Sequence, residues 1–398
     1  MKASVKNSLS TPHESNEIHL ISTFLKQDTF PNIPLNAYLE KEILQVIRQK
    51  IGYLQNATGH GCTSATLALL TALLLAQQKL RDAVSVDKQA IIVSSAAYAN
   101  LGKVIQLLGI PQENIFVLPL PNAVLLDEML LQQYYNQARS QGKIVMAILG
   151  TVLSNTSCTS DDLMVMAQFC ANYGLWFHVD ALYAGAAIFS TAYQNKLAGI
   201  AHADSIGIEI YSQFIFPQRK DFLLLKTTQP SVAHFMNLAR SLCIKASLEE
   251  VRLSASTSFD QADIQFYTLL KNYGTKGLDL FVTQLYDLAH MFAQDVRFRS
   301  DFELVVPAQF NRVCFRYVLP AWTADELNLL NATIGEYLMI DGDGTILRIQ
   351  EANVTYLQIR FFDPNVSGVY FSGIFNKIQR LATVLSAYLR VEREAYRF

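Results

Sequence analysis

Asp180 is the residue whose type and position most clearly suggest chemistry. It directly follows the apolar run Trp176–Val179, and the small residue Ala181 comes next. Such a run predicts a strand buried on both faces of a parallel sheet, and folds of this kind bind ligands beyond the carboxyl ends of their strands. An aspartate in this place can also simply cap a following helix, which is the more economical interpretation of the strand taken alone.

His178 shares a strand face with Asp180, because side chains alternate along a strand. Two interpretations of this histidine remain open. It is either a core histidine on a buried strand or a residue that faces a bound ligand, and spacing alone does not separate the two.

Three further segments carry the same kind of signal. The small and hydroxyl-bearing residues Gly61–Thr66 lead into an apolar helix, Gly150 and Thr151 close an apolar strand, and His202–Ile206 opens the next predicted strand. In order and spacing, these segments resemble the pyridoxal 5′-phosphate (PLP)-dependent amino-acid decarboxylases of fold type I. That group includes the aromatic-L-amino-acid, glutamate and histidine decarboxylases. The resemblance runs over about residues 35–390.

The resemblance implies a role for each of these residues. Asp180 would pair with the protonated pyridine nitrogen of PLP and keep the ring an electron sink, and Ala181 would leave room for the cofactor plane. Thr63 and Ser64, at a helix N-terminus, would bind the phosphate, although an ordinary helix cap uses the same residue types. Thr151 would contact the cofactor or a substrate carboxylate.

Three positions depart from the family pattern. Tyr98 occupies the place of the ring-stacking histidine, and a tyrosine can stack on a pyridine ring but cannot supply imidazole chemistry near neutral pH. Ser212 occupies the place of the lysine that forms the Schiff base with the cofactor, and Tyr211 that of the neighbouring histidine. A serine hydroxyl cannot form an imine and is far too weak a base to replace that lysine.

Lys220 follows Ser212 within the same region of the chain. The simpler interpretation makes it a solvated loop lysine, and the alternative folds it back toward the cofactor as a substitute. The family's loop tyrosine is missing between residues 226 and 258, and its Gly-Arg-Arg motif is replaced by Ser258–Asp260. Together these losses indicate relaxed selection on decarboxylation.

The elements that must position these residues alternate between strands and helices. Apolar strands are predicted at 90–94, 114–118, 144–149, 175–179, 205–210 and 222–226, and helices at 35–54, 64–81, 100–108 and 125–141. Residues 55–61 are predicted to form a polar loop. The pattern predicts an α/β fold with a mainly parallel sheet, of the seven-stranded PLP-transferase type that the resemblance implies, and a smaller C-terminal α+β domain.

We expect three parts along the chain. Residues 1–55 form an N-terminal helical segment that contacts a second copy, residues 56–295 form the large PLP-type domain, and residues 296–398 form the small domain. The homodimer is implied by the resemblance, because this family builds its cofactor site at a subunit interface. Only 17% of the residues are charged and 51% are hydrophobic, which fits extensive burial.

Composition excludes several other classes. The net charge of −2 gives no footprint for nucleic acid, and the high hydrophobic content argues against disorder. The longest apolar run, residues 65–76, is shorter than the ~20 residues that span a membrane, and the N-terminus lacks the apolar core of a signal peptide. The 5 cysteines form no C-x-x-C pair, so we predict neither a metal site nor a disulfide framework. We therefore expect a cytoplasmic protein.

Three functions remain open. The first is a catalytically degenerate relative that acts as a binding or regulatory subunit and holds PLP, or an adduct with a small amino acid or amine, non-covalently. The second is an active PLP-dependent carboxy-lyase that uses Lys220 or lysine-free chemistry. The third is a protein that has lost the cofactor and binds another small molecule in the same cleft.

Overall fold

The structure is a computed structural model of the whole chain. It describes residues 35–395 except for 55, 81–82, 95–100, 120–126, 155–157, 215, 217–219, 228–231, 246–260, 341–345 and 352. Tyr98 therefore lies outside the described residues, as do residues 1–34 of the expected N-terminal segment and Ser258–Asp260.

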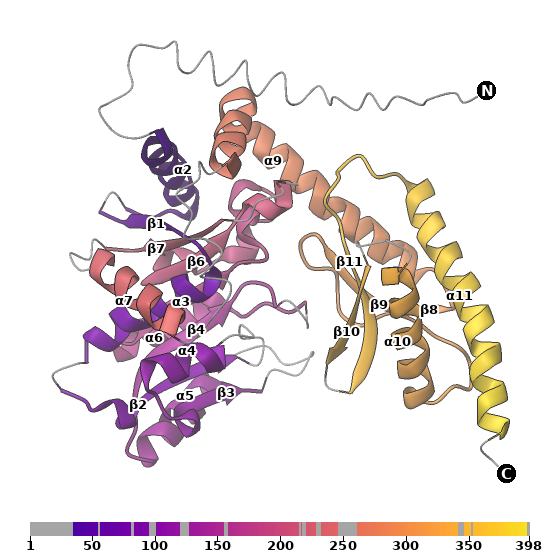
Figure 1. Cartoon of the computed structure of the whole chain (residues 1–398), viewed down its shortest axis with the longest axis horizontal. Helices are drawn as coiled ribbons and strands as arrows, with labels where there is room; N and C mark the ends of the chain where they lie inside the picture. Colours follow the sequence, from indigo (N-terminus) through magenta and orange to yellow (C-terminus); the bar gives the residue numbers. More distant parts are fainter. Residues whose placement is uncertain are drawn as a thin grey trace.

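A seven-stranded sheet forms the centre of the large domain, in the order β1-β7-β6-β5-β4-β2-β3 (Figure 1). Strands β6, β5, β4, β2 and β3 run parallel to one another, whereas β7 is antiparallel to both of its neighbours. The strands are β1 (Thr58–Cys62), β2 (Gln89–Ser94), β3 (Ile115–Leu118), β4 (Ile144–Thr151), β5 (Trp176–Ala181), β6 (Ser205–Glu209) and β7 (Asp221–Leu225). The predicted α/β fold with a mainly parallel sheet is confirmed.

Helices cover both faces of this sheet. The buried side chains of α3, α4 and α7 form one core with Trp176 and Leu223, and those of α5 and α6 form another core with Phe177 and Phe222. The apolar helix α3 is buried almost all round, as its sequence predicts. The helices are α2 (Leu35–Ile51), α3 (Ala65–Gln78), α4 (Leu101–Leu108), α5 (Glu128–Ser140), α6 (Leu163–Tyr173), α7 (Val232–Lys245) and α9 (Gln261–Arg297).

Short 3₁₀ turns complete the large domain. They are η1 (Val86–Lys88), η2 (Gln112–Asn114), η3 (Gly185–Phe189), η4 (Gln194–Leu197), η5 (Ile200–His202) and η6 (Tyr211–Phe214). The turn η6 follows β6 directly, so it lies at the carboxyl edge of the sheet.

The prediction of a loop over residues 55–61 is wrong for residues 58–61, which belong to strand β1. Residues Thr58–Cys62 pair antiparallel with β7 at the edge of the sheet. The sequence of this strand, Thr-Gly-His-Gly-Cys, has no apolar alternation, and only Cys62 is buried. Pairing with β7 uses backbone groups, so the side chains leave little trace of it in the sequence.

A four-stranded antiparallel sheet, in the order β10-β11-β9-β8, forms the small domain. The long helix α9, which kinks at Gly274 with φ 62°, leads into it from the large domain (Figure 1). The elements are β8 (Phe302–Leu304), β9 (Arg312–Tyr317), α10 (Ala324–Ile340), β10 (Ile346–Glu351), β11 (Val354–Arg360) and α11 (Gly368–Ala395).

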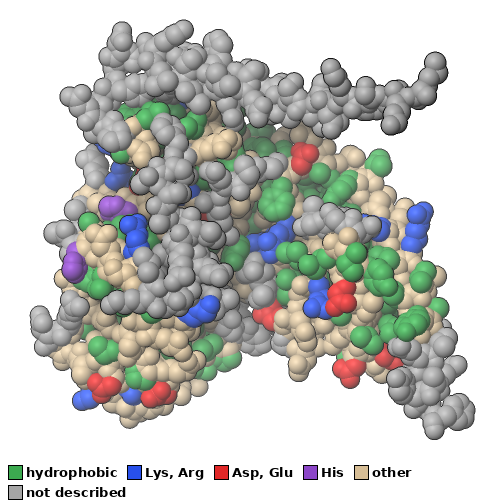
Figure 2. Space-filling model, viewed as in Figure 1, with side chains coloured by type: hydrophobic (Ala, Val, Ile, Leu, Met, Phe, Trp, Pro, Cys, Tyr) green, Lys and Arg blue, Asp and Glu red, His purple; other side chains and the backbone are tan. Residues whose placement is uncertain are grey.

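The surface of the small domain is rich in apolar groups. Figure 2 shows hydrophobic side chains gathered on this domain, at the right of the view. A groove of about 730 Å³ between α10 and α11 is lined by Tyr337, Ile340, Gly373, Asn376, Lys377, Arg380 and Leu381. Within the described part of the chain, no helix combines the length and apolar character needed to cross a membrane.

Phe292 of α9 joins the helix to the small-domain core. Its ring stacks on Phe375 with centroids 4.9 Å apart, and the edges of Phe315, Phe361 and Phe371 surround it. Phe292 is fully buried, so its removal leaves a cavity between two helices and a sheet.

We expect Phe292→Ala to lower the free energy of unfolding by about 3–5 kcal/mol, because transfer and cavity costs add. Urea unfolding measures this. The control is Phe298→Ala, at a side chain 87% exposed, for which a change within about 0.5 kcal/mol is expected. Equal losses in the two variants would contradict the packing described.

Candidate active site

Asp180 lies at the carboxyl edge of the large sheet, one residue before β5 ends. In register it stands between Thr151 of β4 and Gly207 of β6. Its Oδ1 accepts a hydrogen bond from Leu182 N at 3.0 Å, and the side chain is half-buried. Asp180 shares a face with Trp176, which packs with α3, whereas Ala181 is buried on the opposite face.

The N-terminus of α3 lies at the same edge and on the same face as Asp180. Strand β7 is antiparallel to both β1 and β6, so β1 runs in the same direction as β6 and β5. Thr63 and Ser64 follow the end of β1 and therefore lie at the carboxyl edge of the sheet. Ser64 is the buried N-cap, with its Oγ accepting from Leu67 N at 3.2 Å, while Thr63 is exposed. The partial positive charge of a helix N-terminus attracts anions, so this end suits a phosphate.

His178 is a core histidine in this structure. Its Nδ1 lies 2.8 Å from Ser205 Oγ, which also accepts from Trp176 Nε1 at 2.7 Å. The ring is 2% exposed, and burial lowers the pKa of His178 to about 3. The imidazole is therefore neutral at ordinary pH. No local sequence pattern identifies Ser205, 27 positions away, as its partner.

Ser212 is bound to a buried carboxylate, that of Glu209. Its backbone N donates to Glu209 Oε1 at 2.9 Å, and its Oγ donates to the other oxygen of the same group. Glu209 is 1% exposed. Like Gly207, it points to the face of the sheet that α3 covers, which we call the α3 face, and it pairs in register with Asp221 of β7. The hydroxyl of Ser212 therefore holds the η6 turn against the end of β6.

A second buried acid stands next to these residues. Asp221 opens β7 between Glu209 and Cys62, and its side chain is buried on the α3 face. Burial, with help from the charge of Asp221, raises the pKa of the Cys62 thiol to about 12. This thiol stays protonated, and the two carboxylates bring negative charge to the strand ends beside α3.

Tyr211 is placed in the core rather than beside Asp180. Its ring packs against Phe216, Phe222 and Phe266 on the opposite face of the sheet. Its hydroxyl donates to Asp263 Oδ1 at 2.6 Å. The structure therefore does not bring Tyr211 together with Asp180.

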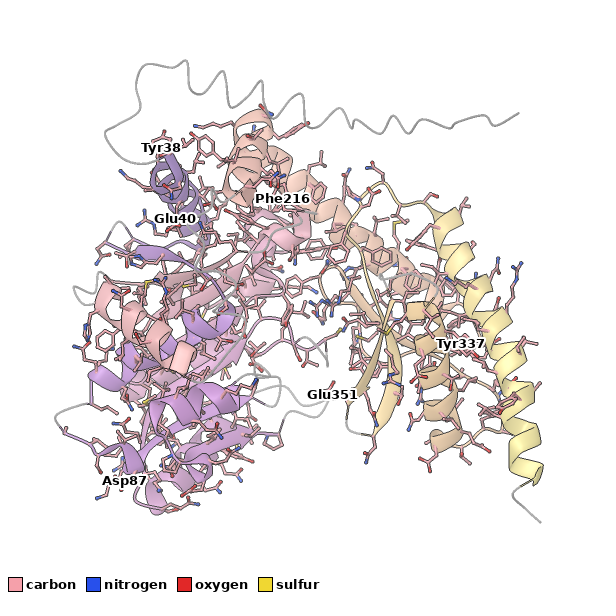
Figure 3. The ribbon with its side chains drawn as sticks, in the orientation of Figure 1. Tyr38, Glu40, Asp87, Phe216, Tyr337 and Glu351 are labelled. Carbon is pink, nitrogen blue, oxygen red and sulfur yellow. The ribbon has the colours of Figure 1, made fainter. Side chains whose placement is uncertain are left out.

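Lys220 forms a buried ion cluster with Glu40 and Asp263. Its Nζ lies 2.5 Å from Asp263 Oδ2 and 2.9 Å from Glu40 Oε2, and its side chain is 11% exposed. Glu40 reaches the cluster from α2 (Figure 3), and it also accepts from Gly61 N at 2.9 Å. Burial opposes the charge of Lys220, but the two carboxylates outweigh it and raise the pKa of the amine well above its ordinary value.

Gly61 leaves room for this cluster. A Cβ at this position would lie 2.5 Å from both Glu40 Oε2 and Lys220 Cε. A larger residue would therefore push the ion pair apart, so the glycine before α3 makes room for charged side chains. The solvated-loop interpretation of Lys220 does not describe its position.

Asp161 ties together two strand ends, and sequence analysis did not single it out. Its Oδ2 accepts from Ser94 Oγ at 2.8 Å and from Thr151 N at 2.7 Å, which joins β2 to β4. The next residue, Asp162, is the N-cap of α6. Both aspartates suit a helix cap, so the residue types alone do not show which one turns toward the sheet.

The arrangement fits the parts of PLP unequally. Asp180 suits a protonated pyridine nitrogen, and the N-terminus of α3 suits a phosphate, although Glu209 and Asp221 oppose an anion there. For the aldehyde, Ser212 offers no amine, and the amine of Lys220 is held by two carboxylates. Among the described residues, no group of three or more His, Cys, Asp or Glu side chains is arranged to hold a metal ion.

The sheet topology and this edge define an α/β protein of PLP-dependent fold type I. The chain belongs to the pyridoxal-dependent decarboxylase family, whose conserved domain matches residues 29–318. The family predicted from the sequence is thereby confirmed, and with it the cofactor of that family, pyridoxal phosphate.

Relatives of known activity match at low identity. An L-2,4-diaminobutyrate decarboxylase of Acinetobacter baumannii is 22% identical over 88% of this chain and 73% of its own. An aspartate 1-decarboxylase of Aliivibrio fischeri is 26% identical over 70% of this chain. The human cysteine sulfinic acid decarboxylase is 23% identical over 74% of this chain. The matches span 56% of the Aliivibrio protein and 62% of the human one.

Solved structures show the same fold. Mouse CSAD superposes with a TM-score of 0.77 at 20% identity, over 93% of this chain and 81% of that one. Oryza sativa TDC with PLP and tryptamine superposes with a TM-score of 0.75 at 19% identity, over 88% of this chain and 77% of that one.

Asp161 gives this site a pH-dependent stability. Burial raises its pKa to about 6 from the ordinary 3.8, although its two hydrogen bonds oppose the shift. The folded state therefore binds the proton more tightly than the unfolded state. Stability from this group is present below about pH 4 and is lost as the pH rises through 6.

We expect Asp161→Asn to gain about 1–3 kcal/mol of stability relative to the unsubstituted chain between pH 4 and pH 7. Urea unfolding of both proteins across this range measures the difference. Asp162→Asn is the matched control, since it removes a neighbouring exposed carboxylate and keeps a good helix cap. A pH-independent difference for Asp161→Asn would sink the assignment.

Proposed function

We propose that this chain is a pyridoxal-dependent decarboxylase homologue that no longer attaches its cofactor covalently and is catalytically degenerate. It binds PLP, or an adduct of PLP with a small amino acid or amine, non-covalently. The observation that supports this most is the engagement of Ser212 with Glu209 at the family's lysine position. When bound, PLP supplies an electron sink, and Ser212 offers no amine that could attach the cofactor covalently and pass it on to a substrate amine.

The ion cluster argues against Lys220 as a substitute. An amine attacks a carbonyl only in its neutral form, and the carboxylates of Asp263 and Glu40 hold Lys220 protonated. Drawing Lys220 away would leave the buried carboxylate of Asp263 without this partner, and breaking such a buried pair costs about 3–5 kcal/mol.

The remaining residues serve binding in this proposal. Asp180 holds the pyridinium, and Ser64 with the first turn of α3 holds the phosphate. Thr151, at the end of β4, lines the cofactor beside Asp180. Tyr98, which lies outside the described residues, is assigned only by the resemblance to the place of the family's ring-stacking histidine. We further propose a cytoplasmic homodimer, in keeping with the family.

An active carboxy-lyase remains the second candidate. The retention of Asp180 on the same face as the N-terminus of α3 favours it, since a protein that had lost all PLP chemistry need not keep both. In this case the substrate amine would react with the cofactor without an enzyme lysine. Its substrates would be amino acids, as those of the diaminobutyrate and cysteine sulfinic acid relatives are.

Titration with PLP tests the first proposal. We expect a saturable change in PLP absorbance and no peptide that carries a borohydride-stable adduct. Asp180→Asn is expected to weaken binding about ten- to hundredfold, because it removes a charged hydrogen bond. The exposed Asp87→Asn is the matched control and is expected to bind as the unsubstituted chain does. A stable adduct on Lys220, or measured carbon dioxide release from amino acids, would support the second candidate instead.

Restoring the lysine tests the pocket itself. We expect Ser212→Lys to form a borohydride-reducible adduct with PLP, located on residue 212 by peptide mapping. Glu209 will hold the new amine protonated, so the yield is expected to rise between pH 7 and pH 9. Ser212→Met, of similar length but without an amine, is the control. A folded Ser212→Lys protein that binds PLP without an adduct at either pH would contradict the assigned position.

A further inference from the structure

The thiols of Cys158 and Cys314 meet between the two domains. Cys158 lies in the connection from β4 to α6 of the large domain, and Cys314 lies within β9 of the small domain. The amide Nε2 of Gln358 is 3.1 Å from Cys158 Sγ and 3.7 Å from Cys314 Sγ. Both cysteines are 1% exposed. A single amide therefore reaches two sulfurs that are far apart in sequence.

The backbone holds both sulfurs at this point. Cys314 and Gln358 face each other across the β9–β11 pairing. Cys158 has a φ of 53°, in the left-handed region that residues other than glycine rarely adopt. Such a conformation persists only where the surrounding structure holds it, and here it accompanies the contact with β11.

The surroundings of the pair are cationic. Arg360 Nε donates to Gln358 Oε1 at 2.8 Å, which turns the amide nitrogen of Gln358 toward the sulfurs. Arg312 is 4% exposed and lies over the Tyr183 ring at 4.6 Å, with its Nη1 donating to Ser154 O at 3.4 Å. Two guanidinium groups thus stand near a pair of thiols, which favours a thiolate.

The two thiols differ in acidity. A hydrogen bond from Cys314 lowers the pKa of Cys158 most, burial opposes it, and Arg312 and Gln358 lower it further. Burial and the same hydrogen bond raise the pKa of Cys314. Cys170, by contrast, is buried without such neighbours, and its pKa is raised. The pair combines one thiol prone to ionise with one that keeps its proton.

We propose that Cys158 and Cys314 form a reversible disulfide site, oxidised by hydroperoxides, that links the two domains. The Cys158 thiolate attacks one peroxide oxygen and the O–O bond breaks. The hydroxide that leaves takes up the proton that the Cys158 thiol lost on ionising and becomes water. Cys314 then attacks the sulfenic sulfur, the S–S bond forms, and the S–O bond breaks. Its proton leaves with the second hydroxide as water. Two thiols lose two electrons in total, and hydrogen peroxide is reduced to two waters.

The link would fix the connection between β4 and α6. This connection begins after Thr151 and contains Asp161, whose side chain binds the ends of β2 and β4. The link would therefore anchor both strand ends to β9 of the small domain. The inference concerns the chain alone and holds whether or not PLP is bound.

Peptide mapping after treatment with hydrogen peroxide tests the site. Trypsin places Cys158 and Cys170 on one fragment, 144–196, and Cys314 on another, 313–316. We expect these fragments to be linked in the unsubstituted chain and in Cys170→Ser, and unlinked in Cys158→Ser and Cys314→Ser. Dithiothreitol should release the link. The oxidised protein should have a higher Tm than the reduced one, because a cross-link constrains the unfolded chain.

Cys170→Ser keeps the test decisive if either of the other variants fails to fold. In that variant Cys158 is the only cysteine on its fragment, so any linked peptide identifies the partner of Cys314. A link through Cys170 or Cys62, a link that forms only in urea, or oxidation of Cys158 to the sulfinic acid without a link would each overturn the proposal.

Discussion

The ammonium group of Lys220, held between Asp263 and Glu40, is the interaction on which much of the large domain depends. Taking charges out of water costs several kcal/mol per ion, so the arrangement is stable only while the partners remain in contact. It joins the start of β7 to α2 and α9, and Glu40 extends it to Gly61 of β1. Asp263 also accepts from Tyr211, which fixes the η6 turn. One set of charges thus positions the edge strand, two helices and the η6 turn that contains Ser212.

Acidic side chains gather at the carboxyl edge of the sheet, on the face that α3 covers. Asp180, Glu209 and Asp221 stand at the ends of three adjacent strands. Carboxylates gathered at one edge attract groups of the opposite charge. Such an edge suits amines and pyridinium nitrogen better than it suits a dianionic phosphate, and the N-terminus of α3 is the feature that offsets this.

The sequence was sufficient for the family, the fold and the position of Asp180, because these depend on apolar runs and their spacing. The partners of Lys220 lie 180 and 43 positions away, and no local pattern connects them. The doublet of Asp161 and Asp162 is ambiguous for another reason, since both residues can cap α6 and only packing against the sheet distinguishes them. Strand β1 escaped prediction because its neighbour supplies the pairing and its own side chains show no pattern.

The ion cluster also has a consequence for the order of folding during synthesis. Domains commonly fold from the N-terminal side as the chain emerges from the ribosome. Glu40 of α2, however, meets its partner lysine 180 positions later, and Tyr38 on the same helix packs against Tyr267 of α9 with ring centroids 6.4 Å apart. The apolar face of α2 also packs against β1 and η3, but its cover is incomplete until α9 has been made. This helix emerges before the strands of the large sheet and is among the last elements of the large domain to dock.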